Sequence, residues 1–273
     1  MTLGFSVDEL LPKTRGAGVL KMGLAKLDEG EWLQPDPDIA ARAEGFAAYS
    51  EGIRLSSEAD APGNELAAML GLVGGLAEAA RAHHEDMCLL TLRTGEEQYR
   101  LVGSAVAWPS DWVPADKMGL PLRALHAPIH GYEEQLASGV DHFMAKLKPG
   151  AIYGRANWFI AATDAGRWVA EAPERAFAHV TPDNAGETLF VRSERQTLRR
   201  LPETGAILFT IGIYVSPFGR LSHRNQHRLA SAVASLIEGE GDRRSVGAYA
   251  DSLIGYAAHK REENQRLPCS QKS

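Results

Sequence analysis

The sequence predicts an α+β protein, in which helices at both ends of the chain flank a central antiparallel β-sheet. Two β-rich runs, at 87–108 and 206–215, supply the clearest strands. Apolar residues repeat at helical spacing before them, in 38–80, and after them, in 229–257. Strands that occupy the middle of a chain and are joined by helical crossovers are typical of the α+β class.

The chain of 273 residues is expected to form a single domain. Its apolar fraction of 44% and charged fraction of 23% are those of an ordinary globular protein, and no shift in composition divides it. We expect a loop-rich arm at 1–36, one domain at 37–265 and a disordered tail at 266–273.

Two helices are expected ahead of the sheet. The first spans about Asp38 to Leu55, and the second begins at Asn64, because asparagine caps helix N-termini well. Apolar residues of the second continue at helical spacing as far as Ala80. The glycines within it indicate either close packing against another backbone or a break in the helix, and we favour packing over a nucleotide-binding loop. These glycines are Gly71, Gly74 and Gly75.

Turn residues and changes of periodicity divide the remaining chain into elements. A helix after Gly131 places Glu133 and Glu134 in its first turn and Lys146 in its last, as the helix dipole favours. The expected elements are a hairpin of 87–93 and 99–108, a proline-rich connection over 108–125, a helix over 133–148, strands at 152–163, 186–191 and 206–215, and helices around 229–237 and 249–257.

Composition excludes several classes of function. The net charge of −6, without a basic cluster interleaved with aromatic residues, argues against a nucleic-acid partner. No apolar run approaches the roughly 20 residues of a membrane span, and the acidic start lacks the features of a signal peptide, so we expect a cytoplasmic protein. Cys88 and Cys269 are too few to ligate an iron–sulfur cluster. The sequence contains no phosphate-binding, flavin or zinc-protease motif.

The segment from Leu125 to Glu134 contains two histidines around a proline. Because Pro128 disfavours helix at the residue before it, we expect His126 and His130 to lie in an extended approach that turns at Gly131. A histidine in a rigid loop beside an apolar wall suits the axial ligation of haem iron. Surface or satisfied core histidines are the commoner alternative.

Two other histidine pairs fit simpler explanations. His223 and His227 are four residues apart, but arginines surround them, so a solvated basic face is expected. His83 and His84 follow a predicted helix, where imidazoles can bind the last carbonyls.

The segment from Val191 to Pro202 is rich in arginine and lies between two predicted apolar strands. It is either a solvated charged run or a source of inward guanidiniums that bind an anion or a propionate. Arg155 and Asn157, on the preceding strand, are placed to add further donors.

Three segments together resemble the haem-dependent oxidative N-demethylase family, that of the dimethylamine-demethylating α subunit. They are His126–Tyr132, Arg155–Trp158 and Arg192–Pro202, and the run from Arg192 to Leu198 is the most specific. The resemblance extends over about residues 20–260. Further support comes from 22–28 with Trp32, from 85–90, from 108–112 and from 117–121.

The resemblance implies a PAS-like core that binds haem b. His126 matches the family's histidine and is the expected iron ligand, whereas His130 stands where we expect a proline and becomes a rival or second ligand. Gly212 likewise stands where we expect an arginine. Arg192, Arg195 and Gln196 are the other expected cofactor-binding residues. Arg195 or Arg155 is the expected distal donor, with Asn157 and Tyr214 orienting the ligand.

The leading hypothesis is a haem monooxygenase that demethylates a small alkylamine or related N-methyl compound with O₂ and releases formaldehyde. Its electrons would come from a separate partner protein, because no flavin or iron–sulfur motif is evident in this chain. The alternative is a non-catalytic haem sensor or carrier on the same PAS-like scaffold. The missing arginine at Gly212 and a second histidine near the iron favour that alternative.

Overall fold

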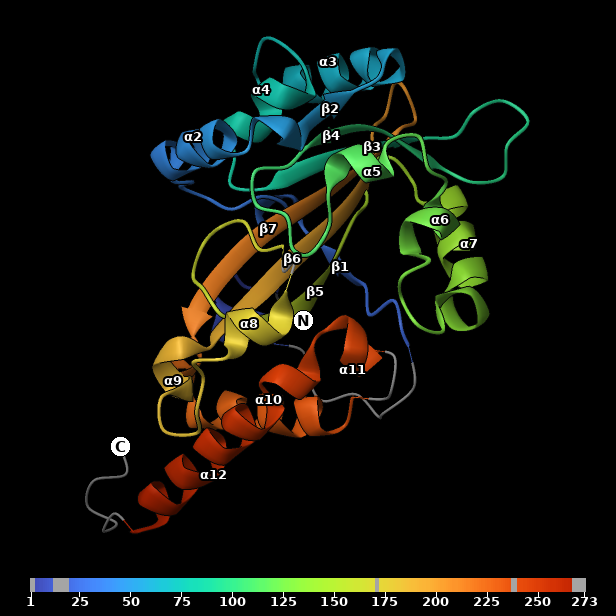
Figure 1. The fold of residues 1–273 in the computed structure, drawn as a ribbon. Coiled ribbons are helices and arrows are strands. Elements are labelled where there is room, and N and C mark those ends of the chain that lie inside the picture. Colours follow the sequence, from blue (N-terminus) through green and yellow to red (C-terminus); the bar gives the residue numbers. More distant parts are fainter. Residues whose placement is uncertain (1–2, 12–19, 170–171, 237–239, 267–273) are drawn as a thin grey trace.

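A seven-stranded antiparallel sheet forms the centre of the structure, a computed structural model that describes residues 3–11, 20–169, 172–236 and 240–266 (Figure 1). The strands lie in the order β1-β5-β6-β7-β3-β4-β2, and the predicted α+β class is confirmed. The strands are β1 (Ala25–Leu27), β2 (Ile53–Leu55), β3 (Asp86–Thr91), β4 (Arg100–Ala105), β5 (Ile152–Ala161), β6 (Phe190–Arg200) and β7 (Ile207–Pro217).

Helices surround the sheet in three groups (Figure 1). The first group holds α2 (Ile39–Ala48), α3 (Asp60–Met69) and α4 (Leu76–Arg81). The second holds α5 (Pro114–Lys117), α6 (Leu122–His126) and α7 (Ser138–Lys146), which follows a π-helical turn at Glu133–Ala137. The third holds α8 (Pro173–Phe177), α9 (Ala185–Thr188), α10 (His223–Ala234), α11 (Glu240–Arg243) and α12 (Ala250–Arg266). The short helix α1 (Val7–Leu10) lies against α10 of this third group, where Asn225 donates to Asp8.

Strand register assigns the polar residues of β5, β6 and β7 to two faces. Arg155 pairs with Gln196 and Asn157 pairs with Glu194, and directly paired residues point to the same side of a sheet. We call this side face A. Arg195 pairs with Gly212 and therefore lies on the opposite side, face B.

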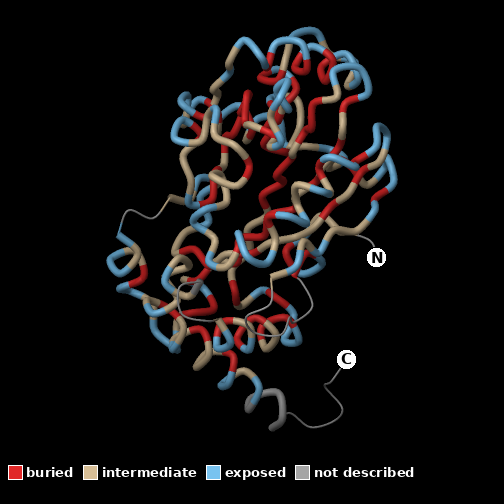
Figure 2. Tube along the Cα trace, turned by 90° about the vertical axis from the view of Figure 1, so that its right-hand side faces the viewer, coloured by how far each residue is buried: buried red, intermediate tan, exposed pale blue. Residues whose placement is uncertain are grey.

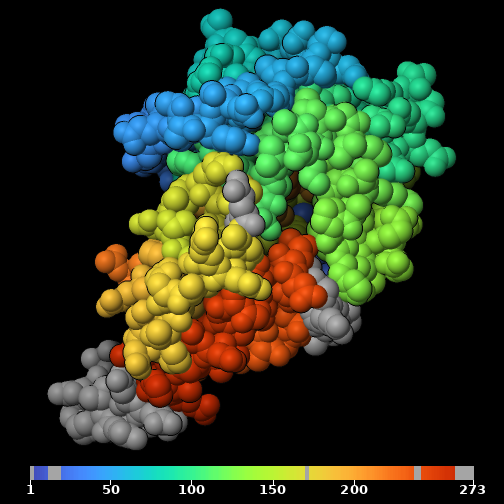
Figure 3. Space-filling model, viewed as in Figure 1, coloured from blue at the N-terminus to red at the C-terminus, as the bar shows by residue number. Residues whose placement is uncertain are grey.

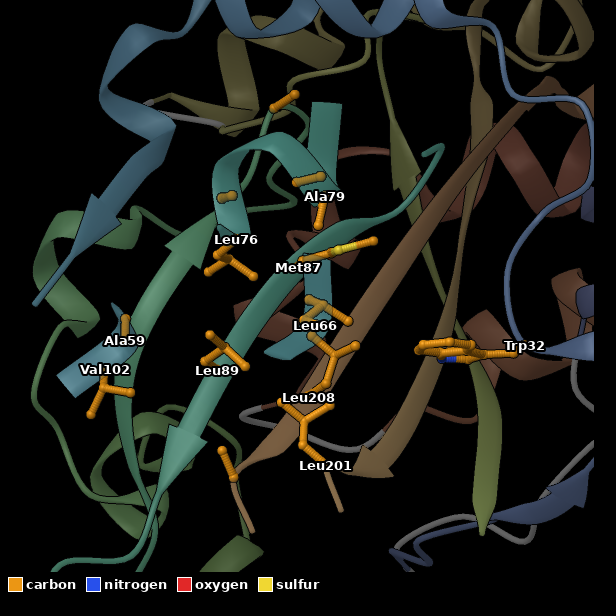
Figure 4. Packing of buried hydrophobic residues seen from close by; sticks show 14 of the residues in the cluster. Trp32, Ala59, Leu66, Leu76, Ala79, Met87, Leu89, Val102, Leu201 and Leu208 are labelled. Atoms are coloured by element: carbon orange, nitrogen blue, oxygen red, sulfur yellow. The ribbon is translucent and has the colours of Figure 1, made fainter. Parts of the chain in front are cut away.

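Each face has its own apolar core. On face B, Met87, Leu89 and Leu208 of the sheet pack against Leu66 of α3 and Leu76 of α4 (Figure 4). On face A, residues of α6 and α7 pack against β3 and β7. The face A cluster contains Cys88, Leu90, Tyr99, Leu101, Val106, Leu122, Met144, Leu147 and Ile207.

A third cluster joins the far end of β5 and β6 to the C-terminal helices. Trp158, Ile160 and Val191 pack there with Leu229 of α10 and Leu253 of α12. Figure 2 shows the buried strands running through the middle of the molecule. Between this cluster and α6–α7, polar side chains occupy face A.

The two predicted N-terminal helices are both shorter than expected. The first ends at Ala48, and Ile53–Leu55 is strand β2 rather than helix. The second divides into α3 and α4, with Asn64 inside α3 instead of at its start. Gly71 and Gly74 have φ angles of +71° and +120°, which a helix cannot contain, so these glycines break the helix rather than allow close packing.

The predictions around β6 were also partly wrong. The stretch predicted as strand from residue 186 contains helix α9, and the strand begins only at Phe190. The arginine-rich segment, placed between two strands, is itself the long central strand β6. Its side chains are covered on both faces of the sheet, but many of them are polar or charged. The strand therefore lacks the continuous apolar run that is typical of a strand buried on both faces.

Some predictions fall outside the described residues. They are the tail beyond Arg266 and the positions of Ile237 and Gly239. In the described part of the chain, no helix is both long and apolar enough to span a bilayer.

Candidate functional site

His126 is the last residue of the short helix α6, on face A of the sheet. Pro121 precedes this helix, and a turn with a positive φ of +74° at Gly131 follows it. The expected extended approach was therefore wrong, although the turn at Gly131 is confirmed. Helix α6 ends at His126, and Ala127 still has helical angles (φ −50°, ψ −33°) although Pro128 disfavours them at the residue before it.

The His126 imidazole is held in one tautomer. Its Nδ1 lies 2.8 Å from the carbonyl oxygen of Leu122, and because a carbonyl only accepts, Nδ1 carries the proton. Burial lowers the pKa of His126, and the positive charges of Arg155 and Lys117 lower it further. The imidazole is therefore neutral near pH 7, and Nε2 has a free lone pair with no hydrogen-bond partner among the described residues.

Tyr132 fixes the orientation of this imidazole. The two rings stack with centroids 4.6 Å apart and planes only 8° from parallel. Tyr132 is 3% exposed, and its hydroxyl has no hydrogen-bond partner among the described residues. Burial raises the pKa of Tyr132 to about 12, so the phenol stays protonated. The stacked pair therefore carries a buried hydroxyl and a ring nitrogen that both lack a hydrogen-bond partner among the described residues, and an unsatisfied buried polar group calls for an explanation.

His130 has a different environment from His126. It lies in the turn after α6 and is exposed to solvent. None of the described residues forms a hydrogen bond, ion pair or ring contact with His130. The structure therefore distinguishes the two histidines by burial and by orientation.

Polar residues of β5 and β6 lie on the same face of the sheet as His126. The Arg155 guanidinium donates to the carbonyl oxygen of Met22 at 3.4 Å, and its charge acts on His126. Beside it, the amides of Asn157 and Gln196 donate to one carboxylate oxygen of Glu194, at 3.4 and 2.8 Å. Face A thus brings Arg155, Asn157 and Gln196 together, as the prediction required.

The surface is hollowed between the green residues of α6–α7 and the red residues of α11 (Figure 3). On the α6–α7 side, the charge of Arg155 acts on both His126 and Tyr132. On the α11 side, Arg244 donates to the side-chain oxygen of Asn157 at 3.4 Å and to the carbonyl of Trp158. The Arg155–Asn157 stretch of β5 therefore links the two sides of the hollow.

Arg195 and Tyr214 lie on face B, away from this hollow. Arg195 donates to the carbonyl oxygens of Leu3, Glu31 and Trp32. The Tyr214 hydroxyl donates to Gln34 at 2.5 Å. Both side chains therefore hold the N-terminal segment against the sheet, and the structure does not bring them together with His126.

Gly212 is also on face B. A Cβ atom added there would lie 3.2 Å from the Tyr214 ring and 3.5 Å from His84. Glu85, which is fully buried, has one carboxylate oxygen without a hydrogen-bond partner among the described residues. The site of the expected arginine thus faces Tyr214 and His84 on face B, on the side of the sheet opposite His126.

Arg192 lies on face A, but neighbouring loops use its donors. It binds the hydroxyl of Ser110 at 2.7 Å and the carbonyl oxygens of Trp108, Pro109 and Ala165. Burial lowers the pKa of Arg192 to about 10. Arg192 consequently fixes the loop that follows β4 beside the hollow.

The other histidines take no part in a metal site. His83 Nδ1 donates to the carbonyl oxygen of Ala79 at the end of α4, in agreement with the predicted capping role, whereas His84 Nε2 donates to the carbonyl oxygen of Ile213 in β7 and does not cap the helix. In the described residues, no three His, Cys, Asp or Glu side chains group together as metal ligands. A metal held through a porphyrin needs only one protein ligand, and His126 is suited to that role.

Sequence reasoning missed Tyr132, Lys117 and Glu194 as residues of this site. Glu194 was hidden because its segment was interpreted as a connection, in which side-chain direction cannot be inferred. Had the segment been recognised as a strand, the period of two would have placed Glu194 on the same face as Arg192 and Gln196.

Residues 72–253 match the family described as "Haem-dependent oxidative N-demethylase, alpha subunit-like". The match spans about two thirds of the chain. It includes α6, α7 and strands β3 to β7, and therefore His126, Arg155, Asn157, Glu194 and Gln196.

Proposed function

Because the chain belongs to the haem-dependent oxidative N-demethylase, alpha subunit-like family, we propose that it is a haem b enzyme that demethylates a small alkylamine or related N-methyl compound. The observation that carries the proposal is the neutral, uniquely oriented imidazole of His126 at the edge of a polar hollow.

The proposal includes a PAS-like scaffold. Two consecutive strands, β3 and β4, are followed by the helices α5 to α7 and then by three consecutive strands, β5 to β7. The five strands lie in the order β4-β3-β7-β6-β5, so that the first strand pairs with the last. This arrangement supports the PAS-like core implied by the resemblance, with a ligand between the helices and face A.

The donor set fits a haem group. An iron-ligating histidine usually donates its other ring nitrogen to a carbonyl, which fixes its tautomer and increases its basicity as a ligand. His126 has this bond to Leu122 together with a free Nε2. Arg155 and Arg244 border the same hollow and supply positive charge suited to the haem propionates. In this proposal His126 is the iron ligand and exposed His130 is not required.

When bound, the haem would supply the activation of O₂ with two electrons. The balanced reaction consumes one O₂, two electrons and two protons. One oxygen atom enters a C–H bond of the N-methyl group and the other leaves as water. The resulting carbinolamine then breaks its C–N bond, giving formaldehyde and the amine that has lost one methyl group.

The protein's own residues have separate tasks in this proposal. Tyr132 prevents rotation of the His126 ring by stacking on it. Arg155 is proposed as the donor on face A, since its charge acts on the imidazole, and Asn157 and Gln196 are proposed to orient the bound group. Arg195 and Tyr214 are not given catalytic roles, because their polar atoms are used on face B.

The electrons are proposed to come from a separate donor protein, and the family description, an alpha-subunit-like protein, is compatible with such a partner. We propose the cytoplasm as the compartment, in keeping with the presence of only two cysteines.

The test is the absorption spectrum of protein reconstituted with haemin, in both oxidation states. We expect a Soret band that His126→Ala abolishes and His130→Ala leaves unchanged, because only His126 is oriented for ligation. Given O₂ and a reductant, the loaded protein should release formaldehyde from dimethylamine. A Soret band that survives His126→Ala would overturn the assignment of the ligand.

The sensor or carrier remains the second candidate, and the PAS-like arrangement of strands favours it. It predicts a haem spectrum dependent on His126 without formaldehyde release from any N-methyl amine. A low-spin spectrum that changes in His130→Ala would support this candidate over the enzyme.

A further inference from the structure

We propose that the free edge of β7 is a docking site for an extended, carboxylate-bearing segment of a partner protein. The segment would add one short strand to the sheet beside Ile213 and Val215. The residues of this surface are not those beside His126, and the proposal requires no haem. It therefore stands independently of the demethylase function.

Strand β7 continues beyond the strand that covers one of its edges. β3 begins at Asp86, which pairs with Ile211, whereas β7 extends to Pro217 (Figure 1). From 212 to 217, β7 pairs with β6 alone, and no described strand occupies its other edge. An unpaired edge presents N–H and C=O groups on which another strand can form.

On this edge a side chain continues the ladder for one more bond. His84 Nε2 donates to the carbonyl oxygen of Ile213 at 2.9 Å, beyond the last residue of β3 that pairs with β7. Backbone groups of alternate strand residues point to the same edge, so those of Val215 also point away from β6. No described residue forms a hydrogen bond with the Val215 N–H or C=O on this side. Val215 therefore offers one donor and one acceptor to an added strand.

A cavity of about 450 Å³, which we call the β7 groove, lies along this edge. Its lining includes four consecutive residues, 213–216, whose side chains alternate between face A and face B. A cavity that contacts both sets borders the edge of the strand rather than one face of the sheet. The other lining residues are 5–8 of the N-terminal segment, and Arg220 and Leu221 after β7. The volume far exceeds the roughly 30 Å³ of one water molecule, so the groove has room for a peptide segment.

The charged groups of the β7 groove favour an anionic partner. Arg220 is exposed, and none of the described residues forms an ion pair or hydrogen bond with it. The acid among the lining residues, Asp8, already accepts from the backbone and hydroxyl of Ser222 at 3.2 Å and from Asn225 at 2.7 Å. These groups belong to the N-terminus of α10, whose dipole offsets the charge of Asp8. A carboxylate on the incoming segment therefore matches Arg220.

These features define the chemistry of the partner. Main-chain hydrogen bonds to Ile213 and Val215 would hold an extended segment of any sequence, and Arg220 would select one with a carboxylate. Pro217 has no N–H, so the added strand is limited to a few residues. A short, acidic, extended segment has both properties.

A second copy of this chain fits the β7 groove less well. The outer strands of the sheet, β1 and β2, are the edges that another copy would offer. They contain Lys26 and Arg54 and no carboxylate. Pairing either strand with β7 would bring a cation toward Arg220, so we assign the site to a different protein.

Fluorescence anisotropy of the full chain with a labelled, end-capped peptide of alternating valine and glutamate tests the proposal. We expect Arg220→Glu to weaken binding of this peptide at least tenfold and to favour the same peptide with lysine in place of glutamate. Lys146→Glu, the same change of charge at an exposed residue of α7, is the matched control and should change binding less than twofold.

The contribution of the backbone is measured separately. The glutamate peptide with N-methylated amides keeps its side chains but loses its N–H donors, and it should bind at least tenfold more weakly. Binding of the unmethylated peptide should slow hydrogen exchange at the amides of Ile213 and Val215. Val215→Pro removes the N–H on this edge without removing a bond to β6, and should also weaken binding at least tenfold.

The outcomes separate the possible occupants of the groove. Failure of the glutamate peptide to bind, or binding that neither Arg220→Glu nor N-methylation weakens, would overturn the proposal. A dimer in sedimentation experiments that Val215→Pro dissociates would overturn it in favour of a second copy of this chain.

Discussion

At the scale of single residues, identical side chains acquire different roles from the atoms around them. His126 and His130 differ by four positions, yet only His126 has its Nδ1 bound to a carbonyl and its ring stacked on Tyr132. Arg155 borders the hollow, whereas Arg195 binds carbonyl oxygens on the opposite face. The sequence identified these histidines and arginines as candidate functional residues. The hydrogen bonds of each side chain then distinguish those that border the hollow from those that stabilise the fold.

The partly desolvated imidazole of His126 should give the protein a measurable pH dependence. In the unfolded chain a histidine titrates near pH 6.5, and burial lowers the pKa of His126 in the folded protein. Between the two values the unfolded state binds more protons. The contribution of His126 to the free energy of unfolding is therefore complete above about pH 6.5 and is lost as the pH falls through the folded value.

We expect His126→Gln to flatten the dependence of the free energy of unfolding on pH between 7.5 and 5, by up to about 1.4 kcal/mol per pH unit. Urea unfolding of the haem-free protein at several pH values measures it. Burial also lowers the pKa of His84, so part of the dependence should remain in the variant. His130→Gln, at an exposed position, is the control and should retain the full slope.

At the scale of elements, whether a helix or strand could be predicted from the sequence depended on which of its residues are buried. β7 was predicted almost exactly, since Ile207 to Val215 are nearly all apolar. The helix before Pro149 was found because Met144 and Leu147 recur at helical spacing with its other apolar residues. In contrast, β6 buries Arg192, Arg195 and Arg199, and propensity rules assign such residues to the surface.

The candidate site was predictable only in part for the same reason. His126, Arg155, Asn157 and Gln196 stood out by residue type and do lie on one face. Which face each β6 residue occupies depends on the pairing of β6 with β5 and β7, and a shift of one residue would exchange the two sets. This long-range register cannot be deduced from local patterns.

The turn between β6 and β7 provides a prediction at this scale. Glu65 of α3 accepts hydrogen bonds from the backbone of Glu203 at 2.7 Å, and from the backbone and hydroxyl of Thr204 at 2.9 and 2.5 Å. Because Glu65 is only 8% exposed, these bonds replace its hydration and join α3 to the sheet.

We expect Glu65→Ala to lower the free energy of unfolding by on the order of 3 kcal/mol, since bonds to a charged group contribute about 1.5–3 kcal/mol each and are not additive. Chemical denaturation measures this change. Glu58→Gln, which breaks the exposed pair with Arg93, serves as the control and should cost less than about 1 kcal/mol. Equal losses in the two variants would refute the role of Glu65.

At the scale of the whole molecule, the two faces of one sheet divide the work. Face B carries the apolar cluster that packs against α3 and α4 and, through Arg195, the N-terminal segment. Face A carries the polar residues beside His126 next to an apolar cluster of its own. Successive side chains of β6 point to opposite sides, so Arg195 and Gln196 take part in different sets of contacts.

This division predicts opposite effects for two arginine substitutions of the same type. Arg195→Met removes the donors that satisfy the carbonyls of Leu3, Glu31 and Trp32, together with the contact over the Phe5 ring. We expect it to lower the free energy of unfolding by roughly 3 kcal/mol or more, and to leave haem affinity in the folded protein within about twofold. Arg155→Met, on face A and only half-buried, should lower the free energy of unfolding by less than about 1 kcal/mol and weaken haem binding several-fold.

Thermal unfolding and haem titration of both variants measure the two effects independently. If Arg195→Met instead reduced haem affinity at unchanged stability, the cofactor would have to be assigned to face B, and the separation of the two faces would be wrong.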